Sequence, residues 1–108
     1  MDFNEYQKAA MEFNHIPANM EIIYPALGLN GEAGEVAEKV KKAIRDNKGV
    51  FSDDCKIAIV KELGDILWYV AAMARDIGYD LQVVADANLH KLYSRARRGV
   101  LGGNGDDR

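Results

Sequence analysis

Two pairs of acidic residues have the spacing and the setting to support chemistry. Glu32 and Glu35 lie in the stretch GEAGEV, and Glu62 and Asp65 lie in KELGDI. The members of each pair are three residues apart, so on a helix they lie on the same face. Each pair also borders an apolar repeat of helical period, which places its carboxylates at the edge of a packed surface.

These four carboxylates predict a site for a hard divalent cation. If the two helices that carry them pack antiparallel, the acids converge, and like charges repel strongly unless they are neutralised. Mg²⁺ and Mn²⁺ prefer carboxylate oxygens and keep coordination positions available for phosphates. The alternative is that the acids form solvated helix faces, as most helical glutamates do. The repetition on two neighbouring helices favours the metal site.

Other metals fit the sequence less well. Zinc is disfavoured because the chain has one cysteine, Cys55, and two histidines that are not clustered. Di-iron bundles use Glu-x-x-His pairs on two helices, and the chain has that spacing only at Glu12 and His15. His90 follows Ala87 at the same distance, so there is no second copy. We therefore expect His15 to end a helix rather than to bind metal.

A polar and basic face lies further along the chain. Asn88, Lys91 and Arg95 have spacings that place them along one side of a helix. Cations beside a carboxylate–metal cluster suit a polyphosphate, because the metal bridges some oxygens and the cations hold others. The alternative is a basic helix end favoured by the macrodipole, which accounts well for Arg97 and Arg98.

The elements that must position these residues are helices. Apolar residues recur at helical spacing through four segments separated by Pro17, Pro25, the DNKGVFSDD stretch and Gly78. We expect helices over about 2–14, from between 18 and 26 to about 47–49, from Ser52 or Asp53 to about 77, and after an Asp80 cap. In the last of these, the residues expected to face inward include Leu81, Val84, Leu89 and Leu92. The predicted fold class is all-α, in one domain over residues 1–108.

Composition bounds the function. The 108 residues carry a net charge of −3, with 48% hydrophobic and 29% charged residues. This balance argues against nucleic acid as a partner, since neutralising phosphates needs a basic excess. The single cysteine fits a reducing compartment, and neither a signal peptide nor a membrane-spanning run is apparent, so we expect no membrane partner and a cytoplasmic protein. So short a chain buries a modest core, which makes oligomerisation a plausible source of further burial.

Three stretches together resemble a known family. GLNGEAGEVAEKVKKAI, KELGDILWYVAAMA and NLHKLYSRARRG look like the MazG-like nucleoside triphosphate pyrophosphohydrolases, whose signature is Glu-x-x-Glu, a spacer and Glu-x-x-Asp. Here the tetrapeptides are EAGE and ELGD, and the likeness extends over nearly the whole chain, including the glycine-rich tail over 99–108. The resemblance implies an all-α, four-helix domain whose bundle is completed in a homodimer or homotetramer. It also implies Mg²⁺-dependent hydrolysis of (deoxy)nucleoside triphosphates to monophosphate and pyrophosphate, with a role in cleaning the nucleotide pool.

The resemblance also implies roles for the acids. Glu32, Glu35, Glu62 and Asp65 match the family's metal-ligand positions. A metal-activated water would attack the α-phosphorus, and either Glu35 or Glu38 would accept its proton. Both residues are therefore candidates for the catalytic base, and Mn²⁺ is a possible substitute for Mg²⁺.

Four further positions match substrate-binding positions of the family. Tyr69 matches a position close to bound nucleotide, Asn88 a polar position associated with substrate, and Lys91 and Arg95 positions associated with phosphates. Trp68 is expected either at a subunit interface, which is favoured, or against a base.

Glycines and the tail complete the expectations. Gly28, Gly31 and Gly34 would allow another helix or a nucleotide to approach the backbone; alternatively, residues 28–31 form a break before the helix. The tail is expected to be a flexible end, or alternatively a segment that folds over a neighbouring subunit's site.

Two alternative functions stay open. One is a related all-α pyrophosphatase restricted to dUTP or dCTP. The other is a non-catalytic helical oligomer that uses the acids to bind a metal for assembly, for which Lys91 and Arg95 would have no use.

Overall fold

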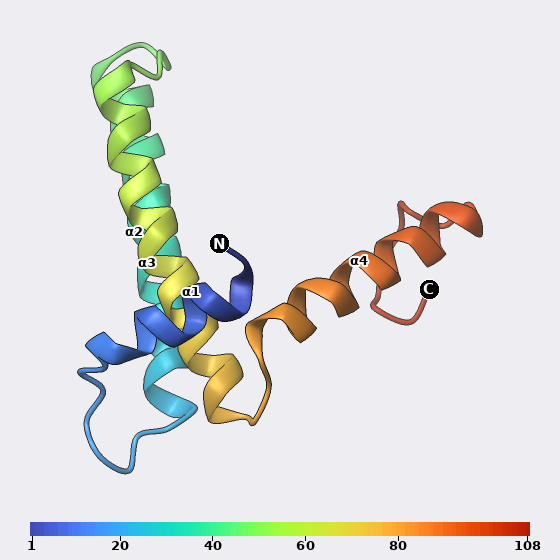
Figure 1. Cartoon of the computed structure of the whole chain (residues 1–108). Coiled ribbons are helices and arrows are strands. Elements are labelled where there is room, and N and C mark those ends of the chain that lie inside the picture. The colour runs from blue at the N-terminus through green and yellow to red at the C-terminus, as the bar shows by residue number, and fades with distance from the viewer.

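The chain folds into helices only, as the sequence predicts. The structure is a computed structural model that describes residues 1–108. Figure 1 shows α2 and α3 side by side as a long hairpin, α1 across its base, and α4 leaving that base in another direction. None of the helices combines the length and the apolar character needed to cross a bilayer. The elements in chain order are α1 (Phe3–Ala10), the 3-10 helix η1 (Met11–Phe13), α2 (Ile23–Asp46), α3 (Asp53–Asp76) and α4 (Leu81–Arg97).

The hairpin of α2 and α3 forms from two helices of 24 residues each, joined by residues 47–52. Ser52 caps α3 as predicted, because its hydroxyl accepts a hydrogen bond from the Cys55 amide at 3.2 Å. Pro25 lies in the first turn of α2, where a missing N–H group has no intrahelical partner to lose. At the base, an Asp76 carboxylate oxygen accepts a hydrogen bond from the Ile22 amide at 2.9 Å. This bond ties the end of α3 to the start of α2.

Gln7 on α1 joins three elements at the base. Its side-chain amide donates to the Ala71 carbonyl at 3.1 Å and to the Tyr79 carbonyl at 3.4 Å. Its carbonyl oxygen accepts from the Leu81 amide at 3.0 Å. Gln7 is buried, and buried polar groups are stable only when they are hydrogen-bonded. One side chain therefore fixes α1 against α3 and sets where α4 begins.

The start of α4 corrects one prediction. Asp80 occupies the N-cap position, but its side chain makes no capping hydrogen bond. Instead Gln7 accepts from the Leu81 amide, and Asn4 accepts from the Gln82 amide at 3.0 Å. Side chains of α1 thus satisfy amides that a helix start leaves unpaired. Side chains of α1 can replace the Asp80 cap because α1 packs directly against this end of α4.

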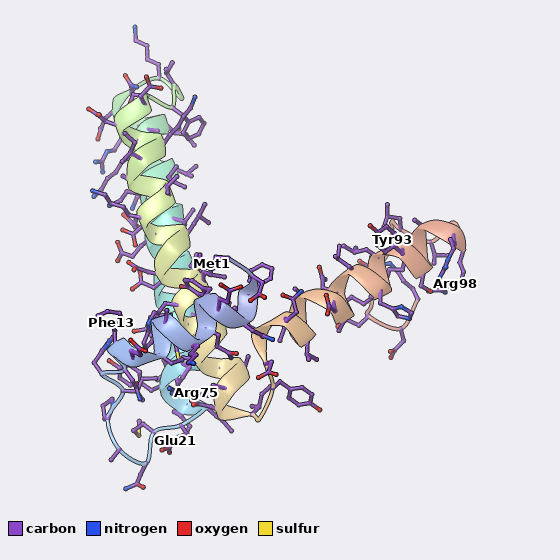
Figure 2. All side chains as sticks on the ribbon, in the orientation of Figure 1. Met1, Phe13, Glu21, Arg75, Tyr93 and Arg98 are labelled. Atoms are coloured by element: carbon purple, nitrogen blue, oxygen red, sulfur yellow. The ribbon has the colours of Figure 1, made fainter.

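The rest of α4 also differs from expectation. Leu81 is buried, whereas Val84, Leu89 and Leu92 are 40%, 49% and 38% exposed. Figure 2 shows side chains such as Tyr93 projecting from α4 with no other helix beside them. Only 8 of the 108 residues are buried, and the radius of gyration is 16.7 Å. A compact domain of this length would have about 13 Å. The apolar stripe predicted on α4 exists, but this single chain offers nothing to cover it.

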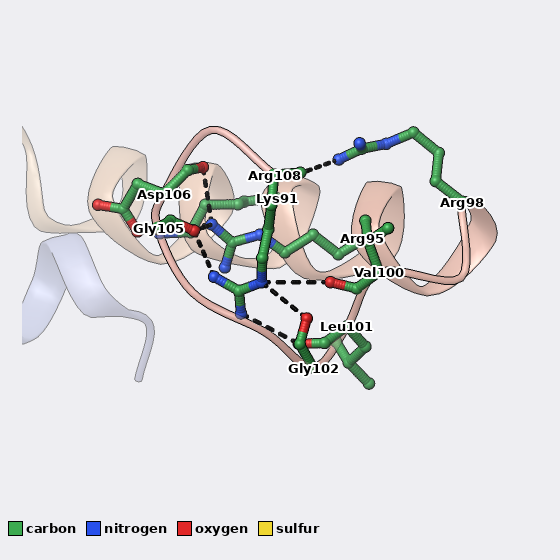
Figure 3. Close-up of polar contacts among 9 residues, drawn as sticks. All are labelled: Lys91, Arg95, Arg98, Val100, Leu101, Gly102, Gly105, Asp106 and Arg108. Carbon is green, nitrogen blue, oxygen red and sulfur yellow. Dashed lines mark hydrogen bonds and ion pairs between the residues drawn. The ribbon is translucent and has the colours of Figure 1, made fainter.

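The tail, residues 99–108, folds back along α4 instead of trailing away (Figure 3). The Arg108 guanidinium donates to four main-chain carbonyls of the tail, and Arg98 donates to the Arg108 main-chain oxygen at 2.7 Å. Positive φ angles at Gly99, Gly103 and Gly105 permit the reversal. The tail is thus packed against α4 in this structure, and its predicted flexibility stays a prediction.

Candidate active site

Three of the four predicted ligand residues come together between α2 and α3. Glu32 from α2 and Glu62 and Asp65 from α3 each offer a carboxylate oxygen, and these oxygens lie within 4.8 Å of one another. We call these three residues the acidic cluster. They meet because each helix places its carboxylates at the edge of the apolar stripe through which the hairpin packs.

The closeness of the three carboxylates in the acidic cluster affects their electrostatics. Burial raises the pKa of Glu32, and a hydrogen bond with Glu62 and the negative charge of Asp65 raise it further. The nearest cation is Lys39, whose Nζ lies 3.9 Å from a Glu62 oxygen. One ammonium beside three carboxylates leaves an excess of negative charge. The oxygen-only donor set suits a hard divalent cation such as Mg²⁺.

The two candidate bases stand in different environments. Glu35 is exposed and is not a member of the cluster, but its negative charge contributes to the raised pKa of Glu32. Glu38 is exposed and pairs with Lys41 at 2.9 Å. The hydrogen bond from Lys41 lowers the pKa of Glu38 below its usual value, which weakens Glu38 as a base.

An aromatic cavity opens directly beside the acidic cluster. Its volume is about 310 Å³, a size that suits part of a small ligand such as a base or sugar. The wall contains two carboxylates of the cluster and four aromatic side chains, and its six residues are Phe13, His15, Glu32, Asp65, Trp68 and Tyr69. We call this space the aromatic cavity.

Trp68 organises the aromatic wall. Its indole N–H donates to the Ala10 carbonyl at 3.0 Å, which anchors the ring to the end of α1. The His15 ring stacks on it at a centroid distance of 5.1 Å and an interplanar angle of 25°. The Tyr69 ring packs edge-to-face with Trp68, at a centroid distance of 5.1 Å and an interplanar angle of 86°. In this chain Trp68 therefore lines the cavity, while its place at a subunit interface stays a prediction.

Phe13 and His15 are the lining residues that sequence reasoning did not assign to the site. The available signal was an aromatic and a histidine just before Pro17, at the end of the first helix. The spacing of His15 from Glu12 suggested only a di-iron pair. Nothing local indicates that this segment returns to α3, more than fifty residues later.

The glycines of α2 serve two different purposes. A Cβ atom on Gly28 would lie 2.3 Å from the Tyr69 Cε1, so Gly28 makes room for the tyrosine ring. A Cβ atom on Gly31 or Gly34 would meet nothing within 4 Å. The predicted close approach is thus made by a side chain of the same hairpin at Gly28, while Gly31 and Gly34 leave an open strip of backbone.

The predicted phosphate-binding residues lie on α4, apart from the acidic cluster. Lys91 and Arg95 belong to α4, which Figure 1 shows directed away from the hairpin. Lys91 pairs with Asp106 at 3.1 Å, and Arg95 is buried beneath the tail. Asn88 is exposed and lines a shallow groove with Val84 and Lys91. Within one chain, these three residues do not join the acidic cluster.

Comparison with known proteins shows the family of the chain. The MazG nucleotide pyrophosphohydrolase domain matches residues 25–100, which include the whole hairpin after its first two residues and all of α4. The chain is also similar to the Gene 37 protein of Mycobacterium phage L5, with 48% identity over 85 residues that cover 79% of this chain and 75% of the phage protein. No solved structure matches the chain. On the extent of the domain match, the chain belongs to the MazG nucleotide pyrophosphohydrolase family.

Proposed function

We propose that the chain is a Mg²⁺-dependent pyrophosphohydrolase that cleaves (deoxy)nucleoside triphosphates to monophosphate and pyrophosphate. The observation that carries the proposal is the contact between two features. The acidic cluster gathers three carboxylates from two helices, and two of them also line the aromatic cavity. A cation-binding group thus adjoins a space suited to a flat, partly apolar ligand, as a nucleotide requires.

Glu32, Glu62 and Asp65 would hold the cation, and Mn²⁺ would be an acceptable substitute. When bound, it supplies charge neutralisation and Lewis-acid polarisation of the phosphates. Glu35 completes the proposed ligand set if its exposed side chain turns toward Glu32, one turn earlier on the same helix. These carboxylates orient the triphosphate by holding its counter-ion in a fixed place.

Glu35 is the preferred proton acceptor of the two candidates. It lies close enough to the cluster for its charge to act on Glu32. Glu38 is engaged with Lys41, which stabilises its ionised form and weakens it as a base. In this assignment Glu35 takes the proton from the attacking water, and Glu38 has a surface role.

The aromatic cavity is the proposed place of the base or sugar. Trp68 and His15 are already stacked, so a base entering the cavity meets flat faces held in position by the Ala10 hydrogen bond. Tyr69 bridges the aromatic wall and the acidic side, because it lies one turn after Asp65 on α3. Its ring position depends on the absence of a side chain at Gly28.

The phosphate-binding residues are proposed to come from a second copy of the chain. Asn88, Lys91 and Arg95 lie on α4, whose apolar side chains remain exposed beyond its first turn. Packing this helix against the hairpin of another copy would cover those side chains and bring the cations toward the acids. The proposal is therefore of a homodimer or homotetramer whose bundle is completed between chains.

The test is a panel of ribo- and deoxynucleoside triphosphates, including modified bases, with and without EDTA. We expect monophosphate and pyrophosphate as products by chromatography, and loss of both when EDTA removes the cation. Hydrolysis of dUTP or dCTP alone would support the restricted alternative. Metal-dependent association without pyrophosphate release from any nucleotide would contradict the proposal and support a metal-assembled oligomer.

A further inference from the structure

The tail places a carboxylate on the two cations assigned to phosphate. Asp106 lies 3.1 Å from the Lys91 ammonium and 3.4 Å from the Arg95 guanidinium, and Figure 3 shows all three residues together. The hydrogen bond from Lys91 and its positive charge, and then the hydrogen bond and charge of Arg95, lower the pKa of Asp106 below its usual value. The carboxylate is therefore ionised at neutral pH, like the phosphate oxygens that the same cations would bind.

Arg95 is incompletely satisfied by this contact. Its side chain is 6% exposed, yet its Nη2 donates mainly to the Asp106 main-chain oxygen at 2.7 Å and the Gly105 carbonyl at 3.3 Å. Its Nε is buried and has no hydrogen-bond partner. A buried guanidinium gains more from ionised acceptors than from neutral carbonyls. An anion with several oxygens would satisfy Arg95 better than the tail does.

The Asp106 side chain is exposed to solvent, whereas the rest of the tail is fixed by hydrogen bonds. The side chain of Asp106 is 84% exposed, so water screens its ion pairs with the two cations and little free energy is lost when it leaves them. The Arg108 guanidinium, by contrast, donates to the carbonyls of Val100, Leu101, Gly102 and Gly105. These bonds close the tail into a loop that returns Asp106 to α4 (Figure 3).

From these contacts we infer that the tail is an internal competitor for substrate, in which Asp106 occupies Lys91 and Arg95 until triphosphate displaces it. This inference rests on the proposed function, because it takes the two cations as phosphate-binding. Its consequence is a weakened apparent affinity for substrate, since each binding event must first break the Asp106 contacts.

The test compares Asp106→Asn with Asp107→Asn. The control removes the same charge from the next residue, for which the structure gives no ion pair. We expect Asp106→Asn to lower KM about two- to fivefold with kcat unchanged, the scale of an exposed ion pair. Asp107→Asn should leave both constants as in the wild type. An unchanged or raised KM in Asp106→Asn would overturn the inference, and a raised KM would indicate that the tail instead prepares the cations for substrate.

A second measurement separates this inference from the proposed function. Hydrogen exchange of residues 99–108 is followed with and without inorganic triphosphate and Mg²⁺, and binding is measured by calorimetry. We expect triphosphate to accelerate exchange in the tail of the wild type and to bind Asp106→Asn more tightly. Nucleotide hydrolysis with unaltered tail exchange would overturn the competitor alone. Absence of both hydrolysis and triphosphate binding would overturn the competitor and the proposed function together.

Discussion

The hairpin and the α4 arm, meaning α4 with its tail, have similar amphipathic sequence patterns but differ in how their helices are packed. In the hairpin, two helices of 24 residues pack along their length and form both the acidic cluster and one wall of the cavity. In the arm, a helix with an apolar stripe touches the rest of the chain mainly at its start. Amphipathic pattern alone therefore does not decide burial.

The two sets of proposed site residues therefore depend on different surfaces. The residues proposed to bind the cation need only the hairpin, whose partner helix follows after a short loop. The residues proposed to bind phosphate need a surface that this chain does not supply, and meanwhile they contact the tail. The acidic cluster is assembled within one copy, whereas the apolar stripe of α4, like the exposed Leu27 and Val60 of the hairpin, needs a partner to cover it.

The largest expected effect comes from breaking the acidic cluster in the hairpin. Glu62→Gln or Asp65→Asn should lower kcat/KM by about 100-fold or more, because a charged group that fixes the reacting phosphates is lost. Pyrophosphate release from nucleotide is the measurement. Glu21→Gln, which removes an exposed carboxylate outside the cluster, should remain close to wild type. Wild-type turnover in both cluster variants would refute the ligand assignment.

The next effect tests whether the arm is covered by another copy. Leu89→Asp places a charge in the exposed apolar stripe of α4 and should weaken self-association by about 10- to 100-fold, the scale of burying one leucine. Sedimentation over a concentration range measures it. His90→Asp, on the side of α4 away from the stripe, is the control and should associate normally. Equal association of the two variants would show that this stripe is not the interface.

A smaller effect separates the two uses of glycine in the hairpin. Gly28→Ala forces the Tyr69 ring to move and should destabilise the fold by about 1–3 kcal/mol. Gly31→Ala meets no atom within the chain and should stabilise an isolated chain by up to about 1 kcal/mol through helix propensity. Chemical denaturation measures both. If Gly31→Ala instead weakens association, the open strip of α2 is in contact with a second copy.

The smallest expected effect is the response of the metal-free chain to pH. Because the folded state raises the pKa of Glu32 above its ordinary 4.5, the unfolded chain releases that proton more easily. Stability should therefore fall as the pH rises from about 4.5 through the raised pKa, and added Mg²⁺ should restore it. Melting temperatures measured across this range test the sign. The same series on Glu32→Gln should show a flatter dependence, and an equal slope would exclude Glu32 as the source.

Local signals were sufficient for the hairpin. The apolar repeat gave both long helices, the Ser52 cap began α3 where predicted, and the three-residue spacing brought Glu32 near Glu62 and Asp65. Each of these follows from the periodicity of one helix, or from two helices joined by a short connection. Such features depend on residues close in sequence, so the chain itself is enough to predict them.

Contacts between distant segments were not predictable in the same way. Gln7 replaces the Asp80 side chain at the start of α4 across more than seventy residues, and neither position carries a local sign of the other. The return of His15 to Trp68 and of Asp106 to Lys91 likewise depends on how elements pack. The direction of α4 was missed for the same reason, since a helical repeat specifies a face but not its partner.

The side-chain amide of Gln7 holds in place a helix, α1, that contacts two distant parts of the molecule. The helix that carries it ends in Ala10, whose carbonyl holds Trp68, and continues to Phe13 at the mouth of the cavity. The same helix supplies the acceptors at the first turn of α4. One short helix thus supports both the aromatic wall of the cavity and the start of α4, so a substitution that displaces α1 should disturb both regions.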